Sequence, residues 1–385
     1  MKKVFSDFMD QFKIKHFINY FVLIGVLVLF VVLKATGSLG RSDYSTLTRI
    51  AFSMILALSL NMVVGFLGEL SLGHAGFMCV GAYVGCYFSN ILNPVLGNGI
   101  VSIIVCMLIG GAVAALFGFI IGIPALRLRG DYLAITTLAF GEIVRNIFKN
   151  IPLFGGAKGL TTANYSYKSL FIVAFAALII ILALIQNLIR SKHGRAITAI
   201  RDNEIAARAM GINVTFYKLL VFVLAAFFAG VAGVLYGKCF GKVEQQTFSY
   251  NYSIEILVMV VLGGMGSING SMIAAAAITF INIKLQDQLS GSLAPWKLII
   301  YAIILIMFMI FLNAPALQNL RSKLSVKNLL EKFRKKDPAI IRADEAEWNR
   351  IQSNIHIDEV LRVDVKEKEG EETEPDKEMG GKSHE

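Results

Sequence analysis

Polar and charged residues inside long apolar runs are the ones that could carry chemistry in this sequence. Ser71 and His74 interrupt one run, and Glu142 lies about 16 Å along a helix that we expect to begin at Asp131. Arg145 follows three residues later and shares the helix face of Glu142. A charge in an apolar helix is costly unless it is paired or faces water.

We therefore expect Ser71, His74, Glu142 and Arg145 to line a path for a polar solute. For Glu142, an internal ion pair that only holds helices together is an equally good interpretation.

Motifs of enzymes and of nucleotide-binding proteins are absent. The one Gly-Lys-Ser, at 381–383, has Asp376 where a phosphate-binding loop needs glycine. There is no His-Glu-x-x-His or Gly-x-Ser-x-Gly, and the four cysteines lie in or beside apolar segments without the spacing of metal ligands. We therefore expect no catalytic residue, no metal and no cofactor, and a membrane-embedded enzyme is the least favoured class.

The composition is that of a membrane protein. Hydrophobic residues make up 56% of the 385 and charged residues 17%, with a mean hydropathy of +0.64. Soluble domains carry about 25% charged residues. The bases lie in short segments between apolar runs, which is typical of cytoplasmic membrane loops, so we do not expect nucleic acid as a partner.

Apolar stretches of about 20 residues are long enough to cross a membrane. They predict an all-α, polytopic helical bundle with about 8–10 transmembrane elements, some of them broken by glycine. The predicted spans are 17–33, 48–67, 72–92, 100–123, 132–148, 170–189, 216–237, 254–283 and 296–312.

The stretch 254–283 is too long for one span, so we expect two short helices joined by Gly-Met-Gly-Ser-Ile-Asn-Gly. A similar pattern of Met-Val-Val followed by glycines occurs at 62–76, which indicates either an internal repeat or close helix packing. The glycines to which we give a structural role are Gly73, Gly76, Gly263, Gly264 and Gly266.

Charge predicts the orientation. The connections 124–131 and 190–218 are basic, so we expect them in the cytoplasm together with both termini, and we expect 150–169 and 238–253 to face outward. The acidic residues are concentrated in 331–385, which holds 16 of the 27. The predicted parts are a cytoplasmic N-terminus at 1–16, a transmembrane domain at 17–312, and a charged, partly disordered cytoplasmic tail at 313–385.

The segment 194–211 is rich in helix formers but too short and polar to span a membrane. We expect one helix along the inner surface, which either seats in the groove of a partner or is a plain amphipathic surface helix. The residues expected to couple to a partner are Arg195, Asp202, Glu204, Ala206, Ala207 and Gly211.

Ala206-Ala207, followed by Gly211, resembles the loop through which ABC importer permeases dock on their ATPases. Ile205 stands where that loop has Glu, and 221–224 lacks its Pro. With the segments at 70–77, 130–135, 140–145 and 261–267, the chain over about 45–312 resembles the branched-chain amino acid permease family, the LivM-type subunit.

This resemblance implies a transport subunit without enzymatic activity in the inner membrane of a bacterium, importing leucine, isoleucine or valine. Its partners would be a second related permease, two ATPases that bind the ATP, an extracytoplasmic binding protein and membrane lipid. The alternatives are a urea or short-amide permease of the same architecture, and a stand-alone carrier or channel.

Overall fold

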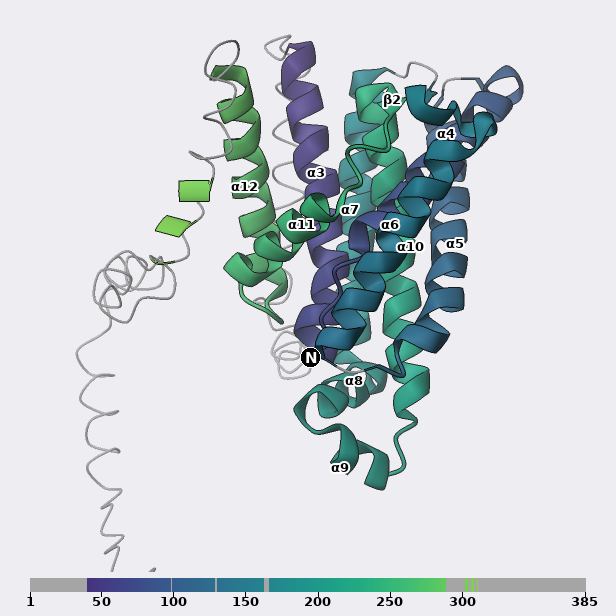
Figure 1. Ribbon diagram of the computed structural model, residues 1–385. Coiled ribbons are helices and arrows are strands. Elements are labelled where there is room, and N and C mark those ends of the chain that lie inside the picture. Colours follow the sequence, from purple (N-terminus) through teal and green to yellow (C-terminus); the bar gives the residue numbers. More distant parts are fainter. Residues whose placement is uncertain are drawn as a thin grey trace, which may run out of the picture. The chain divides into compact units, whose positions relative to one another are not determined.

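The computed structural model describes residues 40–288 except 98, 129 and 163–165, together with 302, 303, 306, 307 and 310 (Figure 1). The predicted span 17–33 and the predicted end segments 1–16 and 313–385 lie outside the described residues. So does most of the predicted span 296–312. The described residues all belong to one compact unit, Met1–Asn313.

The expected all-helical membrane class is confirmed. Ten α-helices account for most of the described chain: α3 (Arg41–Asn61), α4 (His74–Leu96), α5 (Ile100–Ala125), α6 (Asp131–Asn150), α7 (Tyr167–Arg190), α8 (Lys192–Asp202), α9 (Glu204–Ala209), α10 (Val214–Phe240), α11 (Tyr250–Gly263) and α12 (Ile268–Gln288).

Six stretches of the described chain are helical, long and apolar enough to cross a membrane. They are Arg41–Leu67, His74–Leu92, Ile100–Ala125, Ser169–Arg190, Val214–Phe240 and Ile268–Gln286. The predicted span at 132–148 forms α6, which carries four charged residues and is not in this set. Helix α11 has 14 residues and is too short to cross a bilayer unaided.

Glycine-rich breaks interrupt the helices at both predicted places. A π-helix, η2 (Met62–Leu67), continues α3 and ends at Gly68, and the chain then runs without regular structure to His74. The second break lies between α11 and α12, so the prediction of two helices within 254–283 is confirmed. Gly264 and Gly266 have φ angles of 90° and 79° there, which glycine adopts without strain.

One buried asparagine joins the two breaks. Asn61 donates from Nδ2 to the Ser267 carbonyl (3.1 Å) and to Ser271 Oγ (3.2 Å). Its Oδ1 accepts from the Gly266 N–H at 2.9 Å. Backbone groups freed by a helix break must be paired inside a membrane, and this side chain supplies partners for two of them.

Helices α4, α5 and α10 pack together through glycine. A Cβ atom on Gly81 of α4 would lie 2.3 Å from the Gly230 Cα of α10, and one on Gly110 of α5 would lie 2.8 Å from the Gly81 carbonyl oxygen. Small residues let membrane helices approach this closely, and van der Waals contact then stabilises the bundle.

A two-stranded antiparallel sheet, not predicted from the sequence, joins the two connections expected to face outward. Leu160 in β1 (Leu160–Thr161) pairs with Val243 in β2 (Lys242–Val243). Strand β1 precedes α7 and β2 follows α10, whereas α8 and α9 connect the other ends of the same two helices. The sheet and the α8–α9 pair therefore lie at opposite ends of the bundle (Figure 1).

We predict that Asn61→Leu lowers the stability of the folded chain, because the Gly266 N–H and the Ser267 carbonyl lose their partner. Each buried polar group left unpaired costs about 1–3 kcal/mol. The measurement is the thermal unfolding midpoint of the purified chain in detergent. Asn146→Leu is the control, since the exposed Asn146 side chain, among the residues that the structure describes, bonds only within its own helix. Equal midpoints for the two variants would contradict the role of Asn61.

Candidate functional site

The first helix break carries two of the predicted path residues. His74, the first residue of α4, lies 2.6 Å through Nε2 from Ser59 Oγ on α3, and both side chains are buried. Ser71 is also buried, and its Oγ has no hydrogen-bond partner in the structure. The break is therefore a polar, protein-covered segment between two spans.

Helix α6 packs directly against this break. The Leu72 N–H donates to Thr137 Oγ1 at 3.1 Å, and a Cβ on Gly73 would lie 2.0 Å from the Thr137 carbonyl oxygen. A Cβ on Gly76 would lie 2.7 Å from the Gly141 Cα. No side chain fits at Gly73 or Gly76 without moving α6. At the second break, a Cβ on Gly263 would lie 2.4 Å from the Ser271 Cα.

Glu142 and Arg145, the other predicted path residues, form an ion pair on α6 with a distance of 2.5 Å. Glu142 Oε1 also accepts from the backbone N–H of Tyr250 at 3.1 Å, at the start of α11. A carboxylate at a helix N-terminus is favourable because it satisfies a free N–H and faces the positive end of the helix dipole. These contacts fit the alternative in which the pair holds helices together.

No hydrogen bond or ion pair among the described residues links Ser71 or His74 to Glu142 or Arg145. The break and α6 are adjacent, but the partner of His74 is Ser59, whereas those of Glu142 are Arg145 and Tyr250.

The predicted single helix at 194–211 is in fact two helices. Helix α8 ends at Asp202 and α9 begins at Glu204. Asn203 separates them with an extended backbone, φ −158° and ψ 104°, and its side chain accepts from the Ile205 and Ala206 N–H groups. An asparagine that caps the next helix ends the one before it, which outweighs the helix propensity of its neighbours.

Helix α8 touches both breaks through Arg201. Its Nη1 donates to the Gly65 carbonyl in η2 at 3.2 Å, and the Gly266 Cβ position lies 3.6 Å from the same nitrogen. A Cβ on Gly68 would lie 2.7 Å from Arg201 Cγ.

A buried lysine, not identified from the sequence, ties α9 to the first break. Lys218 Nζ on α10 lies 2.5 Å from Glu69 Oε1 and 3.2 Å from Glu204 Oε2. Its side chain is 4% exposed, so the pairs are largely shielded from water. Glu69 lies 149 residues before Lys218, and no spacing rule links residues so far apart. We call Glu69, Lys218 and Glu204 the ion triad.

The other predicted coupling residues lie on α8 and α9 or directly after α9. Arg195 and Ala206 are exposed, Asp202 is exposed and paired with Arg201, and Ala207 is buried. Gly211 follows α9 with a φ angle of 80°. Ile205 and Met210 are 76% and 82% exposed, and we call these two residues the α9 tip. Glu204, next to Ile205, contacts Lys218 as part of the ion triad.

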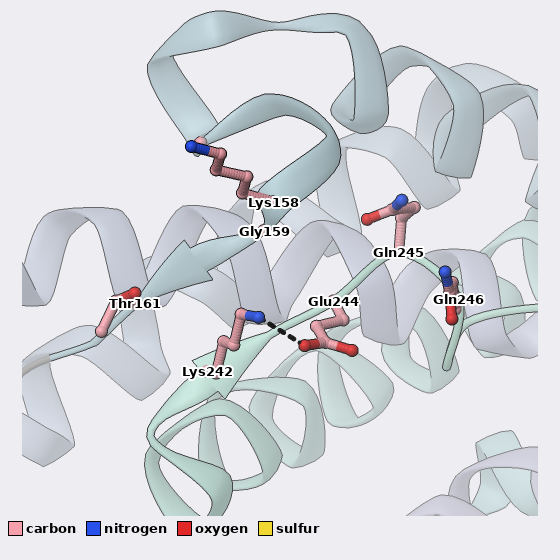
Figure 2. A pocket seen from close by; sticks show the side chains of 8 residues that line it. Lys158, Gly159, Thr161, Lys242, Glu244, Gln245 and Gln246 are labelled. Carbon is pink, nitrogen blue, oxygen red and sulfur yellow. Dashed lines mark ion pairs between the residues drawn. The ribbon is translucent and has the colours of Figure 1, made fainter.

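The opposite end of the bundle has a cavity of about 580 Å³ beside the two-stranded sheet. Figure 2 shows the Lys242–Glu244 ion pair (2.6 Å) on one wall and Lys158, from the other connection, across from it. Gln245 and Gln246 complete a mixed polar and charged surface.

We predict that Lys218→Met destabilises the fold because it leaves two nearly buried carboxylates without their cation. Removing one partner of a buried pair costs about 3–5 kcal/mol. Arg208→Met is the matched control, since Arg208 also pairs with Glu204 at 2.9 Å but is exposed, and it should cost about 1 kcal/mol or less. Thermal unfolding in detergent measures both. Adding Glu69→Gln to Lys218→Met should recover part of the loss, and the absence of any recovery would count against the ion triad.

Comparison with known proteins identifies the family. Residues 44–309 match the family described as "Branched-chain amino acid transport system / permease component". The chain is 35% identical over 339 residues to the high-affinity branched-chain amino acid transport system permease protein LivM of Escherichia coli (strain K12). That alignment covers 80% of this chain and 76% of that protein.

Two further relatives come from Salmonella typhimurium (strain LT2). Identity to its LivM protein is 37% over 298 residues, covering 69% of this chain and 68% of that protein. Identity to its LivH permease protein is 23% over 268 residues, covering 62% and 86%. The family expected from the docking loop and the glycine-rich segments is confirmed, and its members are transport subunits without catalytic activity of their own. The chain is a multi-pass membrane protein that belongs to the branched-chain amino acid ABC transporter permeases, of the LivM type.

Proposed function

We propose that this chain forms part of the membrane pathway of an importer that moves leucine, isoleucine and valine into a bacterial cell across its inner membrane. Its partners in this proposal are a second permease of the LivH kind, two ATPases that bind the ATP, and an extracytoplasmic binding protein. Similarity to both LivM and LivH proteins supports the pairing of two related permeases.

The α9 tip is the observation that carries the coupling role. Ile205 and Met210 are large, apolar and exposed at an end of the bundle where the chain between two spans is polar and basic. Contiguous exposed apolar surface rimmed by polar residues marks protein contact sites, and we infer that Ile205 and Met210 together form such a surface. In our proposal the α9 tip, with Arg195, Asp202, Ala206 and Gly211 around it, seats in a groove of the ATPase in the cytoplasm.

In this proposal the ion triad and Arg201 connect the ATPase contact to the helix breaks. A displacement of α9 moves Glu204 and with it Lys218 and Glu69, while a displacement of α8 moves Arg201 against η2 and the second break. Packed interfaces respond to such a push by switching between discrete arrangements. The first break, with Ser71 and His74, is therefore the segment that we expect to change when ATP is hydrolysed.

The cavity beside the two-stranded sheet would then face outward and receive the binding protein. Its lysine, glutamate and glutamine side chains suit a polar, charged contact surface, which steers association more than it adds affinity. If the predicted spans 17–33 and 296–312 also cross the membrane, both chain termini lie in the cytoplasm in this proposal.

The first experiment is affinity purification of the tagged chain from its native membranes, with identification of the co-purifying proteins. We expect a second permease and ATPases, and leucine uptake by the reconstituted complex only with ATP and the binding protein. A chain that purifies alone and transports in liposomes without ATP would be a carrier or a channel. Urea uptake in place of leucine uptake would change the substrate and leave the class intact.

We predict that Met210→Asp and Ile205→Asp each reduce the ATPase recovered with the tagged chain by about tenfold, because a buried charge replaces an apolar contact. Leucine uptake should fall in parallel, while thermal unfolding of the isolated chain stays unchanged. Leu153→Asp is the control, since Leu153 is an exposed apolar residue of the opposite connection. Normal ATPase recovery with both α9 variants would remove the α9 tip from the docking surface.

A further inference from the structure

A cavity of about 320 Å³ lies between α3, α10, α11 and α12. None of the residues predicted from the sequence to line the path contributes to it. Three of these four helices belong to the candidate membrane spans. Ligand pockets have volumes of about 300–1,000 Å³, so this cavity suits a small solute.

Arg49 brings a positive charge to this cavity from a candidate membrane span. It lies eight residues after the start of α3, about 12 Å along the helix axis, inside the span Arg41–Leu67. Its guanidinium carbon is 4.4 Å from the centroid of the Phe240 ring, a cation–π contact. In the part of the chain that the structure describes, Arg49 forms no ion pair and its buried Nε has no hydrogen-bond partner, while its guanidinium also lies beside the Cys239 thiol.

A second donor without a partner lines the same cavity. Thr279 on α12 is 8% exposed, and its Oγ1 makes no hydrogen bond among the described residues. In a helix a threonine hydroxyl usually bonds a backbone carbonyl one turn earlier, and this one does not. A carboxylate is an acceptor with about four lone-pair positions and pairs strongly with guanidinium. One carboxylate could therefore serve both Arg49 and Thr279.

The rest of the lining matches the remainder of an aliphatic amino acid. Phe52, Met259 and Ile283 offer apolar surface for a hydrocarbon side chain. Glu255 accepts from Asn282 Nδ2 at 2.9 Å and adds a negative charge to the wall, which favours a ligand that also carries an ammonium group.

We propose that this cavity is a binding site for the transported amino acid, with the solute carboxylate on Arg49 and Thr279 and its side chain against Phe52, Met259 and Ile283. This inference rests on the proposed function for the identity of the solute. Helix α3 starts at the end of the bundle that carries the two-stranded sheet and reaches Arg201 through η2 at its other end. The solute therefore meets Arg49 before it reaches the first break.

The test uses the complete importer, reconstituted with its binding protein and ATP. Arg49→Gln and Thr279→Val should each lower leucine uptake, the first by about tenfold or more, because a charge-assisted hydrogen bond is lost. Arg41→Gln is the matched control. Arg41 is an exposed arginine of the same helix that also contacts an aromatic ring, Tyr167, and it does not line the cavity.

Direct binding separates a site for substrate from a site for lipid. In the detergent-solubilised complex without binding protein, leucine at tens of millimolar should raise the unfolding midpoint, and 3-methylbutylamine, which lacks the carboxylate, should not. Arg49→Gln and Thr279→Val should each weaken or abolish the leucine effect. A wild-type complex that ignores leucine, but is stabilised by phosphatidylglycerol through Arg49, would overturn the proposal and assign the guanidinium to a lipid phosphate.

The outcomes also separate this proposal from the proposed function. A wild-type importer that does not transport leucine refutes the function. Normal leucine uptake by Arg49→Gln in a working importer refutes the binding site alone. If Arg49→Gln does not fold, the nearly isosteric Thr279→Val decides, since a hydroxyl with no structural partner can be removed without unfolding the chain.

Discussion

Hydrocarbon cannot satisfy the backbone groups that an interrupted helix leaves free, and this constraint organises the centre of the molecule. The chain has two helix breaks, one after η2 between two candidate spans and one between α11 and α12, and side chains of α3 and α8 bind backbone groups beside them. Asn61 binds backbone groups of the second break, while Arg201 binds the Gly65 carbonyl before the first. Both breaks are therefore irregular segments with backbone groups that side chains of α3 and α8 pair.

The first break is where α6, α8 and the ion triad meet. Helices α8 and α9 reach it from one side through Arg201 and the ion triad, and α6 covers it from another through Thr137. A buried ion pair contributes little net stability compared with apolar packing, but it fixes one geometry strongly once formed. Lys218 therefore contributes less to net stability than to holding α9 and the first break in one arrangement.

The sequence predicted the parts of this protein that depend on local properties. Apolar length located the helices, and the glycines from Gly263 to Gly270 located the second break, because both are read over a few neighbouring residues. The same analysis missed the pairing of Lys218 with Glu69, of Asn61 with Gly266 and of β1 with β2, since each joins residues that are more than 80 apart in the chain. Arg49 is a charged residue in the predicted span 48–67, but the sequence alone does not show that it lines a cavity together with Thr279. The break at Asn203 was a local signal, that of a helix N-cap, and was misread because its neighbours favour helix.

The separation in sequence of Asn61 from its partners has a consequence for biogenesis. Chains are synthesised from the N-terminus, so α3 and the first break are made long before Ser267 and Ser271. Glu69 likewise precedes its partner Lys218 by 149 residues. During that interval the polar groups of the break lack the partners that they have in the folded structure. A chain that stops before α12 leaves Asn61 without Ser267 and Ser271.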